Sequence, residues 1–152
     1  MKKRGICLLP DACYLSELNV PGKPNRTNLG KCAAIQRFLS THPNENLAIL
    51  TPYRNQRALL AGTAKKSSYP QEVSLTVHRA QGREWDTVLF SVVDTDGKWF
   101  TTTLIPKSNG TQIINTAVSR AKKKLILVCD YEYWSRQPNE LIGKLLQIAR
   151  PI

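Results

Sequence analysis

The 152-residue sequence has no long apolar run, no cysteine pair at metal-binding spacing and few acidic residues. A membrane helix needs about 20 apolar residues in succession, and no run approaches that length. The first apolar run, Ile6–Leu9, is also shorter than the about 7–15 residues at the centre of a signal peptide, so we interpret it as a strand. None of the four cysteines forms a Cys-x-x-Cys pair, and only two histidines accompany them, so a zinc site is not predicted. We therefore expect an intracellular protein with reduced cysteines, cytoplasmic or in the nucleoid or nucleus.

The shortage of acidic residues leaves the chain strongly basic. Lysine and arginine number 22 against 11 aspartates and glutamates, which gives a formal net charge of +11. A surplus of this size favours a polyanionic partner, and nucleic acid is the simplest one. The alternative is that the compensating acidic residues lie on a neighbouring domain. The basic residues gather at Lys2–Arg4, Lys65-Lys66 and Lys122–Lys124.

Apolar runs, alternating patterns and helical periodicity predict strands that alternate with helices. The expected strands are Ile6–Leu9, Leu47–Leu50, Val73–Val77, Thr87–Val93 and Leu125–Cys129, and residues 11–24 are expected to be a loop. The expected helices begin after Thr27 or Asn28, at Thr51-Pro52 (running toward Gly62), near residue 112 (ending near 121) and at Tyr133 (ending at Ile148). Strands that are apolar throughout predict an α/β domain with a mostly parallel sheet and helices on both faces. We expect one domain over residues 1–152, with its core at about 25–130 and a closing helix at about 132–148.

Two features separated in the sequence are candidates for contact with a phosphate. Gly82 lies in a turn between two expected strands, where a glycine lets the backbone approach a phosphate closely. Arg120, at the margin of an expected helix, carries a planar and permanently charged fork suited to a phosphoryl group. Glu84 can accept a hydrogen bond from a ribose hydroxyl group. Taken singly, the blander interpretations are favoured, namely an ordinary turn glycine and a surface arginine.

Three segments in order change this balance. They are Thr-Pro-Tyr-Arg-Asn-Gln (51–56), Thr-Val-His-Arg-Ala-Gln-Gly-Arg-Glu-Trp-Asp (76–86) and Ile-Asn-Thr-Ala-Val-Ser-Arg-Ala-Lys (114–122). They resemble motifs IV, V and VI of superfamily 1 helicases, in the branch that includes the nonsense-mediated-decay helicase. The resemblance spans roughly residues 25–130 and implies the second RecA-like (P-loop NTPase-like) domain of a helicase motor.

The resemblance implies a nucleotide-binding role for the second and third segments. Arg120 matches the catalytic arginine finger on the γ-phosphate. Gly82 is expected near that phosphate, Glu84 near the ribose, and Gln81 in the same nucleotide-binding set. Asn115 matches a motif VI asparagine that we interpret as a positioning residue.

The resemblance also implies contacts with a single strand of DNA or RNA. Thr51 and Thr76 match positions that contact the nucleic-acid backbone, and Tyr53 and His78 complete the expected set. His78 stands where many relatives have an acidic residue. Trp99 is a candidate for base stacking, whereas the other two tryptophans are expected in the core.

Half of a nucleotide site is missing from the sequence. None of its four Gly-Lys pairs has the spacing of a phosphate-binding Gly-x-x-x-x-Gly-Lys-Ser/Thr loop, and no Asp-Glu pair of the Walker B kind occurs. ATP with Mg²⁺ is therefore expected to be held mainly by an N-terminal RecA-like domain, and enzyme activity of this chain alone is uncertain. The alternative is a stand-alone, catalytically inactive RecA-like module that binds nucleic acid or a protein. A domain for another phosphorylated ligand is the least favoured interpretation.

Overall fold

The structure, a computed structural model, describes residues 11–16, 27–93 and 110–152. Its centre is a six-stranded sheet with the strand order β3-β2-β4-β5-β1-β6, in which neighbouring strands pair in parallel. The strands are β1 (Asp11–Ser16), β2 (Leu47–Thr51), β3 (Ser74–Thr76), β4 (Trp85–Ser91), β5 (Ala121–Cys129) and β6 (Arg150–Pro151). Within these described ranges, no helix is both long enough and apolar enough to cross a membrane.

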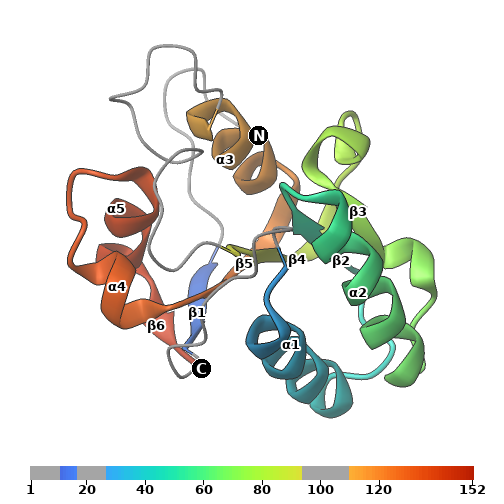
Figure 1. Ribbon diagram of the computed structural model, residues 1–152. Coiled ribbons are helices and arrows are strands. Elements are labelled where there is room, and N and C mark those ends of the chain that lie inside the picture. The colour runs from blue at the N-terminus through green and yellow to red at the C-terminus, as the bar shows by residue number, and fades with distance from the viewer. Residues whose placement is uncertain (1–10, 17–26, 94–109) are drawn as a thin grey trace.

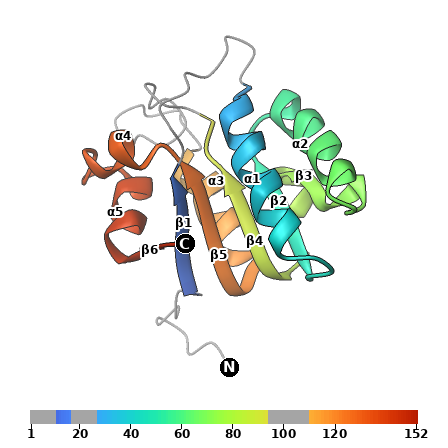
Figure 2. The same ribbon diagram turned by 90° about the horizontal axis from the view of Figure 1, so that it is seen from below.

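Helices lie on both faces of the sheet. The α-helices are α1 (Leu29–Thr41), α2 (Arg54–Lys66), α3 (Gly110–Ser119), α4 (Tyr131–Ser135) and α5 (Leu141–Ile148), and the 3₁₀ helices are η1 (Gln71–Val73) and η2 (Val77–Ala80). Helices α1 and α2 cover one face and α3 covers the other, with α4 and α5 beside β1 and β6 (Figures 1 and 2). The predicted fold class, an α/β domain with a mostly parallel sheet, is confirmed.

The strands are apolar throughout because each one supplies side chains to two cores. In β2, Leu47 and Ile49 pack with the α1 and α2 side, whereas Ala48 and Leu50 pack with the α3 and α5 side. This alternation follows from the two-residue period of a strand. Trp134 of α4 packs in the core on the α3 and α5 side and has no exposed surface, as the sequence predicts.

Two predictions for the ends of the chain are wrong. Residues 11–16, expected to be a loop, form β1, which pairs with β5 from Asp11 opposite Lys124 to Ser16 opposite Cys129. The long-range partner, rather than local propensity, makes this segment a strand. The single closing helix is instead divided into α4 and α5, because Pro138 lies between them and cannot donate to a helical ladder. The expected strand Ile6–Leu9 lies outside the described residues.

The elements around the candidate site also differ in their limits. Asn28 caps α1 as predicted, since its side chain accepts a hydrogen bond from the Lys31 backbone N–H. Thr51 is the last residue of β2 and does not cap α2, which begins at Arg54 and continues past Gly62. The expected strand Val73–Val77 is reduced to the three residues of β3, with a 3₁₀ helix on each side.

Candidate functional site

The predicted nucleotide-binding residues meet where β4 and β5 begin. Arg120 lies one residue beyond α3, not on it as expected, and immediately before β5. Its carbonyl accepts a hydrogen bond from the Trp85 N–H at 2.9 Å, where β4 starts. Its Nη1 donates to the Arg83 carbonyl at 3.3 Å, and its Nε donates to the Thr116 carbonyl at 3.4 Å. These bonds bring Arg120 beside the Gly82 turn although the two are distant in the sequence.

Gly82 adopts a backbone conformation that only glycine reaches at low cost. Its φ is +77°, in the left-handed region. A Cβ placed on Gly82 would meet no atom within 4 Å, so the space around the residue is open. The glycine is therefore explained by its backbone angle, and the turn also leaves an unobstructed approach to its backbone.

The side chains around Gly82 are exposed and include both charges. Gln81 and Glu84 are exposed to solvent, and Arg120 is partly exposed. Arg83 lies 4.9 Å from the centre of the Trp85 ring, which holds this arginine against the sheet. The edge thus combines hydrogen-bond donors of Arg120 with the carboxylate acceptor of Glu84. That donor and acceptor set matches the chemistry of a nucleotide, with its anionic phosphates and its ribose hydroxyl groups.

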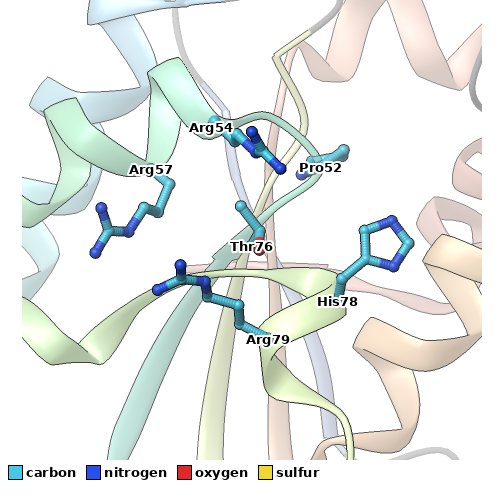
Figure 3. Close-up of a pocket in the computed structure, with 6 residues that line it drawn as sticks. All are labelled: Pro52, Arg54, Arg57, Thr76, His78 and Arg79. Carbon is cyan, nitrogen blue, oxygen red and sulfur yellow. The ribbon is translucent and has the colours of Figure 1, made fainter.

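A basic pocket of about 410 Å³ lies at the opposite edge of the sheet, where β2 and β3 end. Its lining residues are Pro52, Arg54, Arg57, Thr76, His78 and Arg79. Figure 3 shows the two α2 arginines and the two η2 residues extending around Thr76. Thr51 and Thr76 are opposite each other in the parallel pairing of these strands, which fixes where the strands end. Two of the predicted nucleic-acid contacts, Thr76 and His78, therefore line one pocket.

The other two predicted nucleic-acid contacts are differently placed. Thr51 has no exposed surface, and its Oγ1 accepts a hydrogen bond from the Tyr53 N–H at 3.4 Å. The Tyr53 ring is partly buried and packs against the core on the α3 side. Direct contact between the Thr51 side chain and a nucleic acid would require this turn to open, so the structure gives Thr51 a role in shaping the turn.

The short helix η2 connects the two edges. It leaves β3 at Val77 and ends at Ala80, two residues before Gly82. Because β3 and β4 run in the same direction, this segment carries the chain from the carboxyl end of one strand to the amino end of the other. The structure therefore separates the expected ligand-binding segments into two groups at opposite edges of the sheet.

Gln56 belongs to neither edge. Its side-chain amide is fully buried, accepts from the Asn28 N–H at 2.8 Å and donates to the Asn28 carbonyl at 3.1 Å. It also donates to the Ser91 Oγ at 3.3 Å. Gln56 therefore joins the starts of α1 and α2 to the end of β4, so this last residue of the segment 51–56 has a structural function.

Sequence reasoning missed three arginines of the pocket. Arg54 and Arg79 each follow closely on a strand, and Arg57 is three residues beyond Arg54 on the same helical face. That spacing could have been recognised in the sequence. The pocket itself could not, because it depends on β2 and β3 ending side by side, so that α2 and η2 lie at the same end of the sheet.

The other predicted polyanion contacts divide in three ways. Lys65 and Lys66 are exposed in the last turn of α2. Lys122–Lys124 lie within β5, where the Lys123 Nζ forms a salt bridge with the Asp86 Oδ2 at 3.6 Å. The third cluster, Lys2–Arg4, and the stacking candidate Trp99 fall outside the described residues.

Comparison with known proteins identifies the family. A family described as an AAA domain matches residues 24–132. The chain belongs to this AAA domain family. It is 33% identical over 101 residues to the DNA replication ATP-dependent helicase/nuclease JHS1 of Arabidopsis thaliana, a match that covers 62% of the chain and 7% of that protein. A solved structure described as the C-terminal domain of a possible DNA helicase from Lactobacillus plantarum WCFS1 matches with a TM-score of 0.48 and 15% identity, over 80% of this chain and 73% of that one.

Proposed function

We propose that the chain is the second motor domain of an ATP-dependent DNA or RNA helicase, in the superfamily 1 branch that includes the nonsense-mediated-decay helicase. Three lines of support agree. The segments 51–56, 76–86 and 114–122 follow the order of helicase motifs IV, V and VI. The chain belongs to the AAA domain family, and a relative that matches 101 of its residues is described as an ATP-dependent helicase/nuclease.

The observation that carries the proposal is the hydrogen bond from Arg120 to the Arg83 carbonyl at 3.3 Å. It holds a guanidinium group beside the turn that contains Gly82, at the same edge as Glu84. Arg120 then acts as the finger that neutralises charge on a transferring phosphoryl group, while Glu84 accepts from a ribose hydroxyl and Gln81 borders the turn. The substrate in this proposal is ATP with Mg²⁺. An N-terminal RecA-like domain with a phosphate-binding loop would hold most of it.

The opposite edge is proposed to bind a single strand of DNA or RNA. Thr76 and His78 present a hydroxyl and an imidazole within the basic pocket, and Tyr53 lies at the entrance to α2 beside it. Since η2 joins this pocket to the Gly82 turn, movement of one edge is transmitted along a short connection to the other.

The proposal is tested by ATP hydrolysis in the complete natural protein or in this chain joined to a first motor domain. Arg120→Ala should lower the strand-stimulated kcat by about 10³–10⁵, the contribution of an arginine finger. The affinity for a single strand should stay within about twofold. Arg136→Ala is the matched control, because Arg136 directly follows α4, forms an exposed pair with Glu132 and takes part in neither edge.

Two results would contradict the assignment in different ways. Unchanged hydrolysis by the Arg120→Ala protein would remove the finger. A natural protein that binds a single strand but hydrolyses no ATP, with or without the substitution, would instead support the stand-alone inactive module.

A further inference from the structure

The basic pocket at the ends of β2 and β3 contains an excess of positive charge. Arg54, Arg57 and Arg79 line it, and no aspartate or glutamate does among the residues that the structure describes. None of the three has an ion-pair partner in the described part of the chain. Each guanidinium group is permanently charged and offers five N–H donors. Three such groups around one cavity repel one another unless an anion lies between them.

One of these arginines has a buried donor that lacks an acceptor. The Nε of Arg57 is inaccessible to solvent and has no hydrogen-bond partner among the described residues. A buried unsatisfied donor costs about 1–3 kcal/mol, so native structures rarely leave one without a reason. The residue is also fixed in position, because its carbonyl accepts from the Ser74 Oγ at 2.8 Å and ties α2 to β3. Arg57 therefore has unused hydrogen-bonding capacity at the wall of the pocket.

The start of α2 adds to the attraction for an anion. Arg54 and Arg57 are in its first turns. The N-terminal end of a helix carries a partial positive charge from its aligned peptide dipoles, which favours phosphate. The helix has 13 residues, so this contribution is fully developed.

The pocket is suited to the backbone of a nucleic acid rather than to its bases. Among the described residues, no tryptophan, tyrosine or phenylalanine lines it, so these residues offer no surface for stacking a base. A phosphodiester carries one negative charge, and a single one would leave at least two of the arginines uncompensated. The volume of about 410 Å³ lies within the ~300–1,000 Å³ range of pockets for small organic ligands, which is larger than one phosphate group needs.

We propose that Arg54, Arg57 and Arg79, the arginine cradle, hold two or more consecutive phosphodiesters of a single strand. Thr76 and His78 add hydrogen bonds to the same backbone. This inference rests on the proposed function and deepens it, because it assigns the strand's phosphates to three residues outside the predicted set. Binding in the cradle is independent of base sequence and falls steeply with salt.

The test measures binding of fluorescein-labelled dT12 to the full chain by anisotropy, from 50 to 200 mM NaCl. Arg79→Gln should raise the Kd at low salt roughly tenfold, and it should lower the slope of log K against log salt by about 0.7, the value for one phosphate of a single strand. Arg57→Gln should do the same, and the double variant should lower the slope by about 1.4. Arg79→Lys should keep the slope because it keeps the charge. Arg136→Gln, the control directly after α4, should change neither the Kd nor the slope.

Further arms separate the sources of phosphate. A dC12 strand and a 5′-phosphorylated dT12 should bind as unmodified dT12 does. A preference of tenfold or more for the phosphorylated end, or displacement of the strand by micromolar ATP, would overturn the backbone assignment. If the chain binds dT12 and the Arg79→Gln protein, which is substituted at an exposed position, keeps both Kd and slope, the cradle is wrong while the proposed function stands. If the chain binds no strand even at 50 mM NaCl, the cradle and the strand-binding part of the proposed function both fail.

Discussion

Arg120 and Gly82 show how single residues acquire meaning from their neighbours. Either one alone is an unremarkable surface residue in the sequence. The structure joins them through the Arg83 carbonyl and the Trp85 N–H, so that the Arg120 guanidinium and the left-handed turn at Gly82 share one edge. The sequence predicted both residues because of their motif context. It did not predict that Arg120 falls beyond its helix, because helical periodicity cannot fix the residue at which a helix ends.

The backbone of Gly82 makes a prediction that concerns stability. Gly82→Ala should destabilise the chain by about 1–2 kcal/mol, because an L-residue at φ +77° brings its Cβ close to the following carbonyl. Gly62→Ala is the matched control. Gly62 lies in the interior of α2 with nothing within 4 Å of an added Cβ, so alanine should stabilise the helix by about 0.5–1 kcal/mol. Urea denaturation followed by circular dichroism measures both, and shifts of the same sign would contradict this account.

At the scale of elements, the sequence predicted what repeats and missed what depends on a distant partner. The two-faced strands β2, β4 and β5 were recognised because continuous apolar runs signal burial on both faces. Strand β1 was missed since it is a strand only through pairing with β5. The basic pocket was missed for a similar reason. It forms because β2 and β3 end side by side, which brings arginines of α2 and η2 around one cavity.

The Gln56 side chain makes several of the hydrogen bonds that hold α2 against the start of α1 and the end of β4. Gln56→Ala should destabilise the chain by about 2–4 kcal/mol, because it removes the two hydrogen bonds between the buried Gln56 amide and the Asn28 backbone and opens a cavity. Gln36→Ala, at an exposed position on α1, should change stability by less than about 0.5 kcal/mol. Both values follow from denaturant titration of the purified chain. A loss below about 1 kcal/mol for Gln56→Ala would show that other contacts orient α2.

At the scale of the whole molecule, two chemically different edges are joined by one short helix. The edge at which β4 and β5 begin has the Arg120 donors and the Glu84 carboxylate. The described residues that line the pocket at the opposite edge, where β2 and β3 end, include three arginines and no carboxylate. The α/β fold was predicted from the sequence, whereas the three arginines of the pocket were not. The separation of the two edges to opposite ends of the strands was not predicted either, because motif order along the chain does not state which strand ends are adjacent. The proposed function, in which one edge contacts ATP and the other binds a single strand, would account for this division.

Hydrogen exchange in the complete protein tests this division most directly. Backbone amides would be compared without ligand, with a non-hydrolysable ATP analogue, and with a dT12 strand. The nucleotide should protect residues 81–85 and 119–121, and the strand should protect residues 53–57 and 77–79. Protection of the same edge by both ligands, or protection of the first group by the strand and the second by the nucleotide, would contradict the central claim that the two edges have separate functions.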